Sequence, residues 1–300
     1  MNNINLNRNH TLVIFFLSLF FYFSNSEFNS EILPVICFFL ITTIGISHGA
    51  LDHQKGRRFL KIINLNRIEF FYLAYIIFSL LIILTWIILP TLMLIIFLLA
   101  ASYHFGKEDS VFENRPNTKF FNFFLLAKGS LIILAPLIFH SEETLKIFKD
   151  LDVEMLPIDG KILITFCLLS LISNFFICSQ FRNSFLSSLD SVTIILLNLI
   201  FTPLIAFTVY FCFLHSIRHS FSLINEINRK NFKKGLIEFS KKALPLTFLT
   251  GTIFLISLFI LNQYYLLNSA ILKVVFIGLA SLTFPHILLE YLLEKNEKKS

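Results

Sequence analysis

Two histidines lie four residues apart near the end of a long apolar run, in the sequence Phe-Cys-Phe-Leu-His-Ser-Ile-Arg-His-Ser at 211–220. On a helix, residues at this spacing share one face and lie one turn apart, so His215 and His219 can approach the same point. Two imidazoles in that arrangement can bind a single metal ion. Surface helices of ordinary proteins also carry such pairs, so the pair alone is a weak indication of a metal site.

Three further apolar runs also end in histidine, which strengthens the indication from the first pair. One holds His48 and His53, the next holds His104, and the last holds His286. Six of the eight histidines in the chain therefore fall in four short motifs. Two of these motifs also carry carboxylates, which are Asp52, Glu108 and Asp109.

The composition indicates a membrane protein. Of 300 residues, 56% are hydrophobic and only 15% are charged, and the mean hydropathy of +0.76 exceeds that of ordinary soluble domains. The net charge is +6, but the basic residues gather in a few loops, a pattern that orients membrane proteins and does not require nucleic acid. The four cysteines lie inside apolar runs without metal-ligand spacing, so we interpret them as small buried hydrophobes.

The apolar runs predict an all-α, polytopic transmembrane helix bundle in a single domain over residues 1–300. The first run is short and could be a cleaved signal peptide, but we favour a retained helix because the following residues lack the usual small-x-small site. The long stretch 185–221 is divided at 198–203, because Pro203 suits the first turn of a new helix. The ten expected spans (nine if the first is cleaved) are 11–23, 32–51, 68–89, 90–105, 120–139, 162–181, 185–200, 203–221, 243–261 and 270–291.

Loop charges predict how these spans are oriented. The basic segments 54–67 and 225–242 and the basic C-terminus should all be cytoplasmic. In a topology with ten spans and a cytoplasmic N-terminus, all three basic segments lie on the cytoplasmic side and the acidic loop 141–160 lies outside. We therefore expect a multi-pass protein of the inner (plasma) membrane with both termini in the cytoplasm.

In this topology the four histidine motifs end the second, fourth, eighth and tenth spans on the same side of the membrane. His48, His104, His215, His219 and His286 lie 12 to 16 residues from the outer starts of their helices. At 1.5 Å per residue their depths agree within about 6 Å. Ionisable groups that converge at membrane depth are paired, bound to metal or in a wet cavity, and bundle cores are where facing helices build metal sites.

Less specific interpretations apply to some of these residues. A histidine at a membrane end can simply place its polar tip among the headgroups, which is our interpretation of His10 and His140. For His53, a solvated cap is as reasonable as a supporting role. Asp52 lies one turn after His48 and could accept the N–H of that imidazole, fixing its tautomer. The pattern assigns no role to Lys128, which lies mid-span. The solvated-cap interpretation also covers Asp52, Glu108 and Asp109.

As a set, the motifs resemble those of the Brp/Blh-type beta-carotene 15,15'-dioxygenases, integral membrane enzymes of bacteria and archaea. The resemblance covers about 44–288 and leaves the span within 1–30 as a peripheral addition. Leu214 and Ile287 depart from the family pattern, which expects an aromatic and a methionine there, so the substrate pocket could be reshaped. The motifs are Gly45-x-x-His48-Gly49-Ala50-x-Asp52-His53, Ser102-x-His104-Phe105-Gly106-x-x-Asp109, Tyr210-Phe211-Cys212-x-x-His215-Ser216-x-Arg218-His219 and Pro285-His286.

The resemblance implies central cleavage of beta-carotene by dioxygen at a non-haem Fe(2+), giving two molecules of all-trans-retinal that could pass to a rhodopsin. It places the iron ligands on His48, His104, His215 and His219, with supporting roles for Asp52, His53, Asp109 and His286. The residues themselves fit iron, copper, zinc or nickel, because neutral imidazoles bind all four. Four such ligands leave up to two positions on an octahedral ion, and a site reached from hydrocarbon suits a lipid-soluble substrate.

Two other classes stay open on the residues alone. A different histidine-box oxygenase or hydroxylase acting on a lipid commonly uses about eight histidines and two metals, so metal stoichiometry would distinguish it. A non-enzymatic haem-binding or metal-binding transporter would need histidines facing across the bundle, which an optical spectrum would reveal. No nucleic-acid partner is expected in any of these cases.

Overall fold

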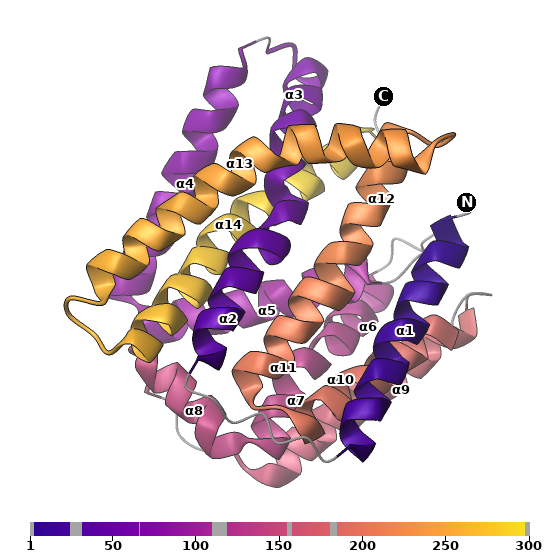
Figure 1. Ribbon diagram of the computed structural model, residues 1–300, viewed down its shortest axis with the longest axis vertical. Coiled ribbons are helices and arrows are strands. Elements are labelled where there is room, and N and C mark those ends of the chain that lie inside the picture. The colour runs from indigo at the N-terminus through magenta and orange to yellow at the C-terminus, as the bar shows by residue number, and fades with distance from the viewer. Residues whose placement is uncertain are drawn as a thin grey trace.

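The computed structural model describes residues 3–24, 32–65, 67–109, 119–154, 158–180 and 185–297, and in these ranges it is all-α (Figure 1). The predicted fold class, a polytopic helical bundle, is confirmed. The helices are α1 Asn3–Phe23, α2 Leu33–Leu40, α3 Asp52–Ile62, α4 Ile68–Ile88, α5 Pro90–Glu108, α6 Lys119–Gly129, α7 Leu131–Phe139, α8 Ser141–Asp150, α9 Gly160–Gln180, α10 Phe185–Ile200, α11 Pro203–Val209, α12 Ile217–Ile227, α13 Phe232–Leu261 and α14 Leu267–Glu297.

Eight helical stretches among the described residues are long and apolar enough to cross a membrane, against ten expected spans. The other two expected spans do form helices. α10 has 16 residues, fewer than the roughly 20 that a crossing needs. α1 has 21 residues, but its first helical turns are polar and include Arg8 and His10. The eight stretches are Leu33–Ile62, Ile68–Ile88, Pro90–Glu108, Phe120–Phe139, Gly160–Ile177, Pro203–Ile227, Phe232–Leu261 and Leu267–Glu297.

The last two helices extend beyond the expected spans for identifiable reasons. α13 begins eleven residues early because the side chain of Asn231 caps it, accepting a hydrogen bond from the backbone N–H of Lys234 at 3.0 Å. α14 continues past the apolar run because carboxylates on its last turns form ion pairs with neighbouring helices. One of these pairs joins Lys107 Nζ and Glu294 Oε1 at 2.6 Å. Both extensions carry charged residues that a membrane crossing would exclude.

The predicted division of the stretch 185–221 agrees with the structure, since α10 ends at Ile200 and α11 begins at Pro203. The continuation of α11 is irregular. Residues Tyr210–Ser216 form a π-helical segment before α12, and a second π-helical segment, Ile41–Gly45, follows α2. Wider turns of this kind change which side chains face a neighbour and are frequent at functional sites. The first segment contains His215.

Two glycines bring α5 and α6 into backbone contact beside His104. A Cβ atom on Gly106 would lie 1.8 Å from the carbonyl oxygen of Leu125, and one on Gly129 would lie 1.8 Å from that of Ser102. Only residues without a side chain permit so close an approach. The contact fixes the position of the last turn of α5.

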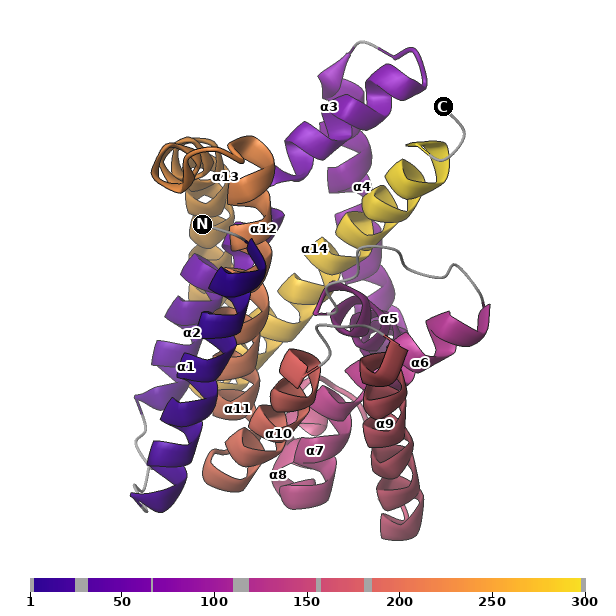
Figure 2. The same ribbon diagram turned by 90° about the vertical axis from the view of Figure 1, so that its right-hand side faces the viewer.

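The basic segments lie at one end of the bundle and the acidic helix α8 at the other (Figures 1 and 2). α3, the turn between α12 and α13, the start of α1 and the end of α14 are all at the upper end in both views. This arrangement agrees with the charge-based orientation, whereas the side of the membrane that each end faces stays a prediction. α4 and α13 are the spans with the smallest buried share, 11% each, so they present most of their surface outward.

Helix α1 packs against α10 and α12. The guanidinium of Arg218 on α12 donates a hydrogen bond across 3.1 Å to Thr11 Oγ1 on α1, and both residues are buried. The peripheral role expected for the first span stays a prediction.

Candidate metal centre

Four imidazoles from α5, the π-helical segment, α12 and α14 form a closed ring. Neighbouring ring centroids are 5.3 Å apart for His104 and His215 and 6.5 Å apart for His215 and His219. The ring closes through His286, which lies 6.2 Å from His219 and 5.2 Å from His104. His104, His215 and His286 are at most 4% exposed. The structure thus brings together residues separated by up to 182 positions, and these are four of the five histidines that were predicted to share one depth.

Local sequence features hold these rings in place. The ring of His215 stacks on Phe211 from the same π-helical segment, with an interplanar angle of 15°, and meets the edge of Phe105 at 4.8 Å. Pro285 lies inside α14 directly before His286. Because proline lacks the N–H for a helical hydrogen bond and crowds the preceding turn, it favours a local deviation of α14 at this point.

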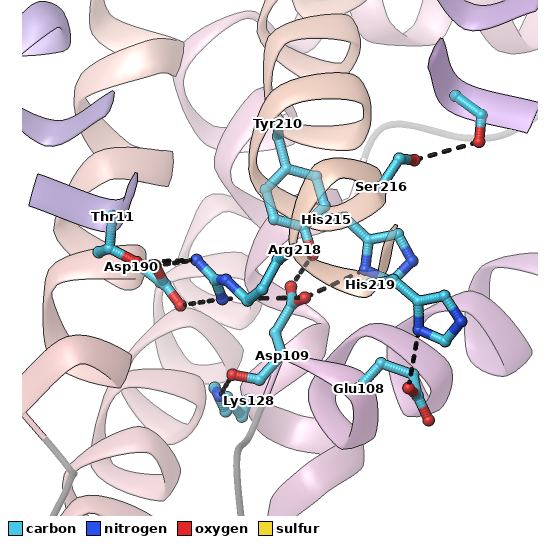
Figure 3. Close-up of polar contacts among 11 residues, drawn as sticks. Thr11, Glu108, Asp109, Lys128, Asp190, Tyr210, His215, Ser216, Arg218 and His219 are labelled. Carbon is cyan, nitrogen blue, oxygen red and sulfur yellow. Dashed lines mark hydrogen bonds and ion pairs between the residues drawn. The ribbon is translucent and has the colours of Figure 1, made fainter. Parts of the chain in front are cut away.

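Each of three imidazoles contacts a carboxylate through Nδ1. His286 Nδ1 lies 2.8 Å from Asp52 Oδ1. His215 Nδ1 lies 3.0 Å from Asp109 Oδ1, and His219 Nδ1 lies 3.2 Å from Glu108 Oε2 (Figure 3). A neutral ring that donates from Nδ1 has its lone pair on Nε2, the atom that can bind a metal. We assign this tautomer from the hydrogen-bond geometry.

Buried charges support the carboxylate of Asp109. The hydroxyl of Tyr210 donates a short hydrogen bond to it, and the guanidinium of Arg218 lies 4.0 Å away. The same guanidinium makes two hydrogen bonds, of 2.8 and 2.9 Å, to Asp190 (Figure 3). Burial alone would raise the pKa of Asp109, but the His215 ring, Arg218 and the Tyr210 hydroxyl hold it well below its usual value. Asp109 is therefore an ionised acceptor.

A second polar group surrounds His286. The hydroxyl of Tyr75 donates to Asp52 Oδ2 at 3.0 Å, which orients the carboxylate that holds the imidazole. Glu290, one turn after His286, has its Oε1 3.6 Å from His286 Nε2 and 2.6 Å from Lys55 Nζ. Among the residues that the structure describes, two groups of donor atoms are each compact enough for one ion, and Glu290 belongs to both. They are His104, His286 and Glu290, and Glu108, His219 and Glu290.

Three of the four predicted metal ligands lie in the ring of imidazoles, namely His104, His215 and His219. His48 lies on the 3-10 turn Ile46–Leu51, and its side chain is outside the described part of the chain. Asp52 contacts His286, whereas we expected it to support His48. His53 contacts the carbonyl oxygen of Ala50 through Nδ1 at 3.0 Å and does not belong to the ring.

The remaining histidines lie apart from this centre. His10 packs edge-on against Phe221, and His140 Nε2 contacts the carbonyl oxygen of Asn198 at 2.7 Å. The ammonium of Lys128, to which the sequence assigned no role, donates to the backbone carbonyl of Asp109 at 3.3 Å. It therefore holds the end of α5 near the carboxylates.

Sequence reasoning missed Glu290, Tyr75 and Lys55. A signal for Glu290 was present, because it follows His286 by four residues, the spacing that singled out His215 and His219. For Tyr75 and Lys55 no local signal exists, since neither stands in a motif that marks chemistry.

A largely apolar cavity of about 870 Å³ borders the ring at His104 and His286. It extends along α14 to Lys273, 13 residues from His286, which is about 20 Å at 1.5 Å per residue. There Lys273 Nζ forms an ion pair with Asp152 Oδ2 at 2.5 Å. Outward-facing side chains of α4 and α13 also line the cavity, so it reaches the outer surface of the bundle. They include Ile76, Leu80, Leu249 and Ile253.

Comparison with known proteins gives one consistent result. A family model described as beta-carotene 15,15'-dioxygenase matches residues 39–294. A protein named beta-carotene 15,15'-dioxygenase, from an uncultured marine bacterium 66A03, is 32% identical over 258 residues, which cover 83% of this chain and 90% of that protein. None of the solved structures matches the chain.

Proposed function

Because the chain belongs to the beta-carotene 15,15'-dioxygenase family, we propose that it cleaves the central 15,15' double bond of beta-carotene at a non-haem iron(II) held by histidines. One dioxygen molecule supplies one oxygen atom to each of two molecules of all-trans-retinal. The observation that carries the proposal is the ring of buried imidazoles that opens onto an apolar cavity. The bound iron would supply the activation of dioxygen.

The donors fit such an ion. His104, His215 and His219 are the proposed ligands within the described ring, and the family motif adds His48. Nitrogen donors without thiolates suit iron(II) among the first-row metals. Asp109 and Glu108 accept hydrogen bonds from Nδ1 of their imidazoles, which leaves the Nε2 lone pairs available to hold an ion and would raise their basicity.

The cavity suits one half of a carotenoid. It has the elongated apolar lining that a polyene requires, and it starts at the imidazoles where the central bond must lie. Burying the polyene among apolar side chains excludes water from the metal and favours binding through the hydrophobic effect. Because side chains of α4 and α13 reach the outer surface, the substrate enters from the lipid bilayer.

The setting of the reaction follows from the same features. We place the protein in the inner (plasma) membrane with both termini cytoplasmic, on the basis of the loop charges and the shared end of the basic segments. Dioxygen and beta-carotene both partition into lipid. Retinal is released into that phase, where a rhodopsin could take it up.

Co-expression in a carotene-producing bacterium tests the proposal. The wild-type chain should bleach the cells and yield retinal, and the purified protein should contain about one iron per chain. His104→Ala should abolish both, while His140→Ala serves as the matched control. Retained carotene with no retinal, or a purified active protein without iron, would contradict the proposal.

A further inference from the structure

We infer that His286 binds the metal directly through Nε2, so that α14 contributes a ligand and not merely a supporting residue. This inference rests on the proposed function, because it concerns the same ion. It changes the assignment of His286, for which the sequence implied a supporting role. It also gives α14 a defined part in the site.

His286 occupies a position equivalent to those of the proposed ligands. His286 closes the ring of imidazoles, with its centroid 5.2 Å from that of His104 and 6.2 Å from that of His219. These separations are close to those of the other two sides of the ring, 5.3 and 6.5 Å. A supporting residue would be expected to lie outside the ring, behind a ligand. His286 instead lies at a corner equivalent to those of the proposed ligands.

The pairing of an imidazole with a carboxylate, seen at two proposed ligands, is repeated at His286. Asp52 holds Nδ1 of His286 at 2.8 Å, as Asp109 holds His215 at 3.0 Å and Glu108 holds His219 at 3.2 Å. Carboxylates in this position orient metal-binding imidazoles. Asp52 is 4% exposed and is itself oriented by Tyr75. The molecule therefore gives His286 the same support that it gives the two proposed ligands.

Electron-pair donors converge beside His286. Its Nε2 lies 3.6 Å from the carboxylate of Glu290, and donor atoms of His104, His286 and Glu290 lie within 4.8 Å of one another. Several electron-pair donors that converge in a buried place are stabilised by a cation between them. Glu290 is less suited to bind the ion, because Lys55 Nζ neutralises it at 2.6 Å. We therefore assign the ligand role to His286 and the balancing of charge to Glu290 and Lys55.

Five imidazoles would be available to hold the ion. With His48, His104, His215 and His219, the imidazole of His286 would make five nitrogen donors. A six-coordinate ion would then keep one position for a small molecule. The carotenoid would be held by the cavity alone.

X-ray absorption of the purified, iron-loaded full chain tests the inference directly. We expect five imidazole donors in the wild type and one fewer in His286→Gln, with His140→Ala as the matched control. Iron affinity, measured by competition with a chelator, should fall by more than the 10–100-fold typical of a supporting residue. An unchanged number of imidazoles in His286→Gln would overturn the inference.

Two further measurements keep the outcomes separate. If His286→Gln does not fold, Asp52→Asn preserves the shape of the site, and the absorption bands of the cobalt(II)-loaded protein should shift. Unchanged bands would show that His286 is not a ligand. If the wild type itself binds no iron, the proposed function fails. If the wild type binds iron and neither variant changes the spectra, only the metal-ligand role of His286 is refuted.

Discussion

Asp52 and His286 are 234 positions apart in sequence, yet the carboxylate of one lies 2.8 Å from the imidazole Nδ1 of the other. The contact joins the start of α3 to the middle of α14, beside the ring of four imidazoles. It is supported from a third helix, because the Tyr75 hydroxyl on α4 donates to the same carboxylate. Three spans therefore meet at one side of the proposed metal site.

Replacing Asp52 by Asn should lower iron affinity by about 10–100-fold, because the amide is a weaker acceptor for the Nδ1 proton. Competition with a chelator measures this. Tyr75→Phe removes one hydrogen bond to the same carboxylate but leaves the Asp52–His286 contact in place, so iron affinity should fall less than in Asp52→Asn. Equal effects of the two variants would show that Asp52 acts through general stability.

His215→Ala and His219→Ala should each lose iron and beta-carotene cleavage together. The cause is shared, since each variant removes a nitrogen donor for which water is a poor substitute. Iron content and retinal yield, measured on the same preparations, check this. His10→Ala, outside the ring, should behave as wild type. Full iron and full activity in both ring variants would refute the proposed site.

Arg218→Met should destabilise the protein by about 3–5 kcal/mol, because it leaves the buried carboxylate of Asp190 without its two hydrogen bonds. Thermal unfolding in detergent measures the loss. The double variant Arg218→Met, Asp190→Leu should recover most of it, since both charges are then removed. If the double variant is no more stable than the single one, the ion pair is not the cause.

Gly106→Ala should destabilise the contact of α5 with α6 by about 1–3 kcal/mol, because the new methyl group would overlap the Leu125 carbonyl oxygen. Gly160→Ala is the matched control, since no atom lies within 4 Å of its added methyl group. Denaturation of the two variants in the same detergent compares them. A Gly106→Ala protein as stable as the control would mean that the helices can separate without penalty.

Both termini should be cytoplasmic. A reporter fused after Lys161 should indicate the outer side, and one fused within 233–242 should indicate the cytoplasm. The reverse result at either position would overturn the orientation derived from the loop charges.

The bundle and the family were predictable from sequence because both depend on local patterns. Apolar runs define the helices, Pro203 marks a helix start, and spacing places His215 and His219 on one face. The estimated depths of His104 and His286 along their helices also placed both at the same level in the membrane. The exact number of spans was less accessible, because α1 and α10 are helices whose length or polarity falls short of a crossing.

Pairings between helices could not be predicted. Asp52 lies one turn from His48, and only the packing of α3 against α14 shows that it contacts His286. The π-helical segment Tyr210–Ser216 likewise has no clear sequence signature, although it sets the direction of His215. Such features depend on how whole helices pack, and the ligand set itself stays a prediction for experiment.

The length of the cavity is set by α14. The cavity borders this helix from His286 to Lys273, and the roughly 20 Å between these two residues is fixed by the rise of a single helix. In the proposed reaction, the bond that is cut would then be selected by length, as the position reached when the substrate's end group lies against the ion pair of Lys273 and Asp152. Adding or deleting residues between His286 and Lys273 would shift the cut along the polyene and yield two products of unequal length.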